Sequence, residues 1–108
     1  MRKSGEFVAV EPWPNSLLVN MGNITTAWSN GRFNNVRHRV MCKEAKTRVS
    51  IVSFIRGPKD TVLEPPSELV DTEHPRLYVP FTQDDLAKLR QSAMIFTGEG
   101  LDYFRTNL

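Results

Sequence analysis

Proline and glycine divide the first sixty residues into short segments, and this punctuation constrains the fold more than any other feature of the sequence. Proline cannot donate a backbone hydrogen bond and glycine favours tight turns, so neither suits the interior of a long helix or a central strand. Pro12 and Pro14 follow an extended run at residues 6–10, and Gly57-Pro58 ends the region. The pattern therefore predicts several short strands in this half of the chain.

Two runs in which apolar and polar residues alternate lie within that region, at residues 35–42 and 48–56, and a short polar link joins them. Asn30-Gly31 precedes them and is a strong turn sequence, because both residues tolerate positive φ. Gly22-Asn23, after a short apolar run, is a weaker turn sequence. We expect strands at residues 6–10, 35–42 and 48–56.

The chain changes character after residue 60. Four of its seven prolines lie between residues 61 and 80, which predicts an irregular but ordered segment. The stretch from Thr82 to Asp85 resembles a capping box, with Asp in place of Glu, and predicts a helix that ends near Ala93.

The apolar residues of this region indicate which helix faces are buried. Leu86, Leu89 and Ala93 fall on one face of the first helix. A second short helix is expected over residues 99–105, with Leu101 and Phe104 turned inward.

Composition excludes several classes of protein. The chain is 40% hydrophobic and 24% charged, which is typical of one soluble globular domain and not of a disordered chain. No apolar run approaches the roughly 18 residues of a membrane helix, so we expect no membrane partner. Cys42 is the one cysteine and cannot form an internal disulfide, which favours a reducing, cytoplasmic location. We expect Cys42 to be a small core residue.

Positive charge is concentrated in the first half of the chain. Residues 1–60 carry ten Lys or Arg and four Asp or Glu, whereas residues 61–108 carry four and eight. A basic half suits nucleic acid or an anionic small molecule. The basic set has few interleaved aromatic residues, so we expect no nucleic-acid partner; its members are Arg37, Arg39, Lys43 and Lys46.

His38 is the first residue that could carry chemistry. In an extended strand it shares a face with Val36, Val40 and Cys42, on the side expected to be buried. Two interpretations stay open: a core histidine with satisfied hydrogen bonds, or a metal ligand, since a neutral imidazole in a dry pocket suits Fe, Zn or Cu.

Arg48 and Ser50 form the second candidate. They lie two residues apart, so both project from one face of the next strand, together with Val52 and Phe54. A planar guanidinium and a nearby hydroxyl suit recognition of a carboxylate. The alternative is an edge-strand arginine whose side chain reaches water.

Four short stretches in this order resemble the plant iron(II)- and 2-oxoglutarate-dependent dioxygenases, in their C-terminal half: Leu17–Gly22, Ser29–Arg32, Val36–Val40 and Arg48–Ser50. The resemblance implies a mainly β fold, a partial double-stranded β-helix (jelly-roll) with C-terminal covering helices. Residues 1–60 would form the C-terminal half of the jelly-roll core. Residues 61–108 would supply an irregular Pro-rich segment and the C-terminal helices of the same domain.

The resemblance also implies roles for the candidate residues. His38 would be one ligand of Fe(II) in a site of two histidines and one carboxylate, and Arg48 and Ser50 would bind the distal carboxylate of 2-oxoglutarate. The implied reaction oxidises a small organic acid with dioxygen and releases succinate and carbon dioxide. Residues 26–31 and 54–60 look most like the dioxygenases that oxidise the auxin indole-3-acetic acid, and next like the gibberellin oxidases.

Two departures qualify the resemblance. The family's His-x-Asp or His-x-Glu motif is missing, because His74 is followed by Pro75 and Arg76. We therefore expect either the C-terminal part of a longer enzyme or a truncated, non-catalytic chain that acts by association with another chain. Asn23 also stands where relatives usually have Asp, and we expect a small local effect.

Overall fold

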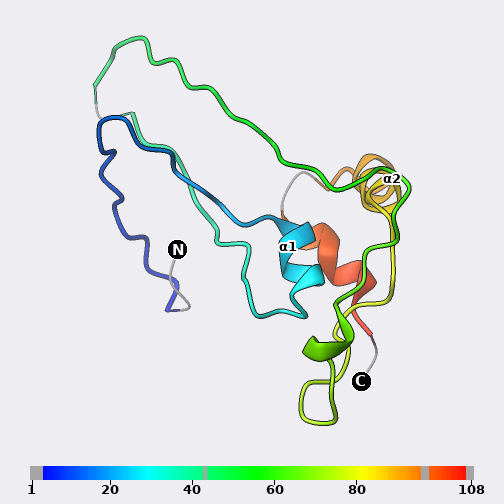
Figure 1. Cartoon of the computed structure of the whole chain (residues 1–108). Coiled ribbons are helices and arrows are strands. Elements are labelled where there is room, and N and C mark those ends of the chain that lie inside the picture. The colour runs from blue at the N-terminus through cyan, green and yellow to red at the C-terminus, as the bar shows by residue number, and fades with distance from the viewer. Residues whose placement is uncertain (1–3, 43, 96–97, 107–108) are drawn as a thin grey trace.

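The computed structural model describes residues 4–42, 44–95 and 98–106. Its elements are α1 (Asn23–Trp28), a 3-10 helix η1 (Ser67–Leu69), α2 (Gln83–Ser92) and a 3-10 helix η2 (Gly98–Phe104). The short helix η2 contacts both α1 and α2. Figure 1 shows the helices gathered on one side, while the blue N-terminal segment and much of residues 33–42 and 44–55 extend away from them.

The three predicted strands do not form sheets within this part of the chain. Residues 6–10, 35–42 and 48–56 have no ladder partner, and the cross-strand pairs described are two isolated antiparallel bridges, Leu63 with Phe81 and Tyr78 with Arg105. A strand is stable only when a neighbour satisfies its backbone groups. The expectation of a mainly β chain is therefore not confirmed by these segments.

The apolar faces predicted for those strands are exposed. Ile51 and Ile55 are 97% and 100% exposed, and Val36 and Val40 beside His38 are also open to solvent. Cys42 is exposed as well, so its expected place in the core is wrong. The alternation of apolar residues is present, but no other described segment covers the apolar side.

The hydrophobic core combines α1 with the C-terminal part of the chain. Buried Phe81 stacks on the half-buried Phe104, with ring centroids 4.3 Å apart and planes inclined by 23°. Such pairs stabilise a core beyond the area they bury. The fully buried apolar residues are Ala27, Tyr78, Phe81, Leu86 and Leu101, with Ile24, Leu63, Leu77 and Phe104 packed around them.

The C-terminal helices agree with the sequence pattern. The Thr82 side chain accepts the backbone N–H of Asp85, and the Asp85 carboxylate accepts that of Thr82 at 2.8 Å, which completes the predicted capping box. In α2, Leu86 is buried and Leu89 half-buried, whereas Ala93 is exposed. Two of the three residues predicted to share the buried face of this helix are therefore shielded from solvent.

The second predicted helix is η2, a 3-10 helix. Its inward residues are those expected, because Leu101 is buried and Phe104 is half-buried against the core. None of the helices in the described ranges is long and apolar enough to cross a bilayer.

Helix α1 was not predicted from the sequence. Its six residues, NITTAW, include three β-branched side chains with modest helix propensity, and Gly22 at its N-cap offers no side-chain hydrogen bond. The helix is instead stabilised by burial, since Asn23, Thr26 and Ala27 are all buried. Asn23, which departs from the family pattern, accepts a hydrogen bond from Asn35 at 2.7 Å.

Asn30-Gly31 ends α1 as the turn sequence predicts. Both residues have positive φ, 50° for Asn30 and 79° for Gly31. The Gly31 N–H donates to Thr26 O at 2.8 Å and the Asn30 N–H to Ala27 O at 3.0 Å. This pair of bonds is the Schellman motif, with asparagine at the left-handed position.

The buried side chain of Asn30 joins this turn to a segment about forty residues further along the chain. Its Nδ2 donates toward three carbonyl oxygens, those of Leu69, His74 and Pro75, at 3.1, 3.3 and 3.2 Å. Its Oδ1 accepts the Leu77 N–H at 2.9 Å. We call these four contacts the Asn30 network; together they dock residues 69–77 against the end of α1.

Replacing Asn30 by alanine should destabilise the fold strongly. The substitution leaves the Leu77 N–H and the Pro75 carbonyl oxygen without the partner that Asn30 gives them. The other two carbonyl oxygens each lose one of two donors, and each unpaired group in a partly buried place costs about 1–3 kcal/mol. We expect the free energy of unfolding to fall by at least about 2 kcal/mol in denaturant titrations. The matched control is Asn34→Ala at an exposed position; equal stabilities of the two variants would contradict the role of the network.

The capping box should make α2 sensitive to acid. The backbone N–H of Thr82, and then its hydroxyl, lower the pKa of Asp85 below its ordinary value of 3.8. A carboxyl group whose pKa is lowered in the folded state stabilises that state fully at pH values above its ordinary pKa. This contribution is lost as the pH falls through the lowered pKa. Asp85→Asn should remove that part of the acid dependence in pH-dependent unfolding curves.

Thr82→Ala tests the same capping box without a change of charge. It should cost about 1 kcal/mol at neutral pH. An unchanged stability of Thr82→Ala, or an unchanged acid dependence of Asp85→Asn, would show that the capping box does not stabilise α2.

Candidate iron and 2-oxoglutarate site

His38 lies on the drawn-out segment that follows α1, with its ring exposed. Its Nδ1 is 3.0 Å from the backbone carbonyl oxygen of Val36. A carbonyl oxygen only accepts hydrogen bonds, so Nδ1 carries a proton, which leaves Nε2 as the ring nitrogen that can bind a metal. Histidines that ligate metals are commonly held in this way by a backbone carbonyl.

The residues on either side of His38 hold its segment in place. Arg37 forms an ion pair of 2.7 Å with Glu99 in η2. The Arg39 guanidinium lies over the ring of Phe7, 4.2 Å from its centroid. Side-chain contacts on both sides of His38 therefore position this segment, although it pairs with no strand among the described residues. His38, between these two arginines, remains accessible.

Arg48 and Ser50 lie on the following exposed segment. Val52 and Phe54, expected to bury this face, are 67% and 79% exposed, so the guanidinium is not desolvated here. Among the described residues, no hydrogen bond or ion pair joins Arg48 or Ser50 to His38. The three candidate residues are accessible, but the described contacts do not assemble them into one pocket.

The metal donors of the described chain are incomplete. Within residues 4–42, 44–95 and 98–106, no three His, Cys, Asp or Glu side chains gather closely enough to hold a metal ion. His38 has the tautomer that a ligand needs, but one imidazole does not hold catalytic iron, which takes two histidines and a carboxylate.

His74 has a structural place. Its backbone N–H donates to Asp71 Oδ1 at 2.6 Å, and its Nδ1 lies 3.0 Å from the same oxygen. The His74 backbone N–H, as the largest influence, lowers the pKa of Asp71. The His74 carbonyl oxygen accepts from Asn30, so this turn forms part of the segment that docks against α1.

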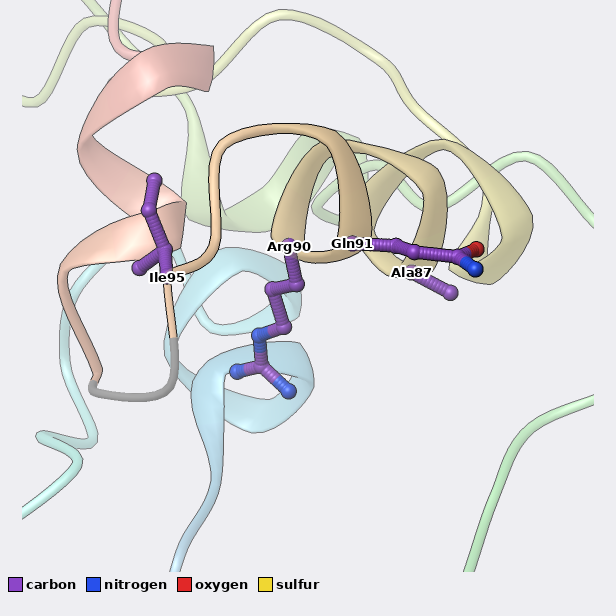
Figure 2. Close-up of a pocket in the computed structure, with 4 residues that line it drawn as sticks. All are labelled: Ala87, Arg90, Gln91 and Ile95. Carbon is purple, nitrogen blue, oxygen red and sulfur yellow. The ribbon is translucent and has the colours of Figure 1, made fainter.

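Two surface hollows lie away from the candidate residues. Figure 2 shows the first, beside α2, where the Arg90 side chain extends toward α1; its lining residues are Ala87, Arg90, Gln91 and Ile95. The second lies between α1, including Trp28, and residues 57–64. Neither hollow is lined by His38, Arg48 or Ser50, so neither is the site expected from the sequence.

Sequence reasoning missed the Asn30 side chain. The Asn-Gly pair predicted the turn, but nothing local indicates that the amide binds residues 69–77. Its partners lie far along the chain, and they are backbone carbonyl groups, which every residue type has. Their positions therefore cannot be recognised from the sequence. Arg32 was missed for the same reason; its guanidinium donates to Leu69 O at 2.9 Å.

Comparison with known proteins identifies the family. The profile described as the 2OG-Fe(II) oxygenase superfamily matches residues 1–57. A 2-oxoglutarate-dependent dioxygenase DAO of rice (Oryza sativa subsp. indica) is 52% identical over 98 residues, which cover 91% of this chain and 33% of the relative. Gibberellin 20 oxidase 1 of Oryza sativa subsp. japonica is 41% identical over 78 residues, covering 72% of this chain and 21% of the relative.

A solved structure agrees with these matches. The crystal structure of the rice dioxygenase for auxin oxidation (DAO) superimposes with a TM-score of 0.88 at 50% identity, covering 95% of this chain and 35% of that one. The chain thus spans about a third of the length of these DAO relatives. Because the profile matches more than half of its residues, the chain belongs to the 2OG-Fe(II) oxygenase superfamily.

Proposed function

We propose that this chain forms the C-terminal part of an iron(II)- and 2-oxoglutarate-dependent dioxygenase that oxidises a small organic acid. The observation that carries the proposal is the match to rice DAO at 50% identity and a TM-score of 0.88. Residues 1–60 would complete the C-terminal half of a jelly-roll core, and residues 61–108 would cover it. The exposed apolar faces of residues 36–55 suit such a place, because strands of a longer chain would bury them.

His38 is the proposed metal ligand, through Nε2. Its Nδ1 hydrogen bond to Val36 O orients the ring and leaves Nε2 to bind. The remaining histidine and carboxylate would come from sequence upstream of this segment. When bound, Fe(II) supplies the activation of dioxygen.

Arg48 and Ser50 are the proposed binding partners of the distal carboxylate of 2-oxoglutarate. A guanidinium binds a carboxylate with two parallel hydrogen bonds, and a serine hydroxyl adds a third donor. Burial of the segment against a longer fold would strengthen these contacts, because they weaken in water. Their role is to hold and orient the cosubstrate.

Indole-3-acetic acid is the proposed first candidate for the substrate. The rice relative is a dioxygenase for auxin oxidation, and it matches across nearly the whole chain. Residues 26–31 and 54–60, which look most like the auxin dioxygenases, also lie together in space. Trp28 and Gly57-Pro58 line the same hollow, which supports treating the two stretches as one structural unit.

A non-catalytic role through association is the second candidate. It is favoured by the large exposed apolar surface, in which Leu17, Ile51 and Ile55 are more than nine-tenths exposed. Surfaces of this kind usually mark a contact with another protein segment. In this role the chain would pair its unpartnered extended segments with another polypeptide.

A chimera tests the enzymatic role. Residues 1–108 replace the matching C-terminal third of rice DAO, and turnover of 2-oxoglutarate and indole-3-acetic acid is measured. Arg48→Ala should raise the KM for 2-oxoglutarate roughly tenfold or more, because a charge-assisted bidentate contact is lost. Arg48→Lys should be intermediate, since lysine keeps the charge but not the fork.

Lys59→Ala is the matched control for the chimera, since it removes an exposed positive charge from the same stretch of chain. It should leave the KM for 2-oxoglutarate unchanged. Unchanged 2-oxoglutarate kinetics in Arg48→Ala would refute the assignment of Arg48. A chimera that folds but turns over no 2-oxoglutarate would favour the non-catalytic role.

The isolated chain should associate as its concentration rises. Sedimentation velocity should show larger species at higher concentration, because the exposed apolar segments are buried in the associated state. Replacing Ile51 and Ile55 by threonine should weaken the association while keeping the β-branched shape. A single monomeric species that unfolds cooperatively at all concentrations would contradict this expectation.

A further inference from the structure

The Asn30–Gly31 junction is chemically labile as well as structurally important. Asparagine is a thermolabile residue, and its side-chain amide can be attacked by the backbone nitrogen of the next residue. Glycine at that position offers the least steric hindrance because it has no Cβ. No other asparagine of this chain is followed by glycine.

The reaction is deamidation through a cyclic imide. The Gly31 backbone nitrogen loses its proton to base and bonds to Asn30 Cγ, and the bond from Cγ to the side-chain nitrogen breaks. That nitrogen leaves as ammonia, which carries away the proton. Water then opens the ring at either carbonyl and gives aspartate or isoaspartate, so water is consumed, ammonia is released and no redox agent is needed.

The folded chain holds both reacting groups in an unreactive arrangement. The Gly31 N–H is engaged with Thr26 O at 2.8 Å. The Asn30 amide is held through the Asn30 network, with its oxygen bonded to the Leu77 N–H. Asn30 is only 6% exposed, which keeps water and base away from Cγ. The attack therefore requires residues 69–77 to leave the end of α1, so that the Asn30 amide is free, and the Gly31 N–H to leave Thr26 O.

We propose that Asn30–Gly31 is a latent deamidation site, protected by the docking of residues 69–77 and able to react only when that segment opens. Local opening of this kind occurs in native proteins at a free energy below that of global unfolding. The inference concerns chain chemistry alone and requires neither iron nor cosubstrate, so it stands apart from the proposed enzymatic function.

Deamidation at this site would prevent the segment from docking again. The product places a carboxylate oxygen where the amide nitrogen donates to the carbonyls of Leu69, His74 and Pro75. Carbonyl oxygens cannot donate, so all three contacts of this oxygen become repulsive, while the other carboxylate oxygen keeps the Leu77 N–H. Isoaspartate also lengthens the backbone within the Schellman turn. The reaction would thus convert a transient opening into a permanent one.

Mass spectrometry of the full chain tests the proposal. Trypsin cleaves after Lys3 and Arg32, so one peptide contains Asn30 together with Asn15 and Asn20. These two asparagines are exposed and serve as internal references for an unprotected side chain. The chain is incubated at mildly alkaline pH with and without denaturant. Conversion of Asn30 should be at least about tenfold slower in native buffer, because only the open fraction reacts. Equal rates in the two conditions would overturn the protection.

A variant of the docked segment links protection to docking. Asp71 Oδ1 accepts the backbone N–H groups of Glu73 and His74, so Asp71→Ala loosens the turn that presents two of the three carbonyls. It should speed native-state conversion of Asn30 several-fold and leave the rate in denaturant unchanged. Glu73→Ala is the matched control, because the backbone of Glu73 rather than its side chain donates to Asp71. If Asn30 reacts at the same native-state rate in Asp71→Ala as in Glu73→Ala, docking of residues 69–77 does not control the reaction, and the proposal is overturned.

Asn30→Asp tests the consequence for docking. Amide hydrogen exchange across residues 69–77 should rise in this variant and stay at the wild-type level in Asn34→Asp, an exposed control. Wild-type exchange in Asn30→Asp would show that the carboxylate is accommodated, which would overturn the claim that deamidation blocks docking.

Discussion

One buried amide joins α1 to the segment that leads into the hydrophobic core. Asn30 ends α1 in the left-handed conformation, and its side chain joins that turn to the backbone of residues 69–77. Gly31 is favoured here because its φ of 79° strains any other L residue, and a Cβ would also lie 2.7 Å from Leu77 Cδ1, which would have to shift. With these contacts made, Leu77 and Tyr78 are placed over α1, and Phe81 can stack on Phe104. The polar network thus positions the segment from which the apolar core is built.

The residues proposed for chemistry lie outside this anchored part. The segment of His38 is held through neighbouring side chains, among them the ion pair of Arg37 with Glu99 and Arg39 over the Phe7 ring. Exposed contacts of this kind are worth little in water. Arg48 and Ser50 lie further along the same open stretch. The contrast follows from packing. Segments that pack against another segment of this chain are buried, whereas segments that would pack against other parts of a longer dioxygenase fold are exposed to solvent.

The agreement between sequence and structure is best where the interactions are local. The capping box needs only Thr82 and Asp85, three residues apart, and it forms as expected. The turn at Asn30-Gly31 follows from backbone preference, and so does its positive φ. Helix α1 was missed because its stability comes from burial of Asn23, Thr26 and Ala27 and not from propensity. The expected burial around Cys42 was wrong because alternation predicts which residues share a face, not what covers it.

The sequence by itself determined the capping box of α2, the turn at Asn30-Gly31 and the family to which the chain belongs, because each depends on residue types at short or characteristic spacing. The turn expected at Gly22-Asn23 is instead the start of α1. The sequence also singled out His38, Arg48 and Ser50, whose roles remain a proposal. Only the tertiary structure decided that Asn30 binds three backbone carbonyls, that α1 exists, and that the runs at residues 35–42 and 48–56 find no strand partner here. The physical reason is that backbone carbonyls are the same in every residue and that a strand exists only through its neighbour. Neither property can be read from the side chains of one segment.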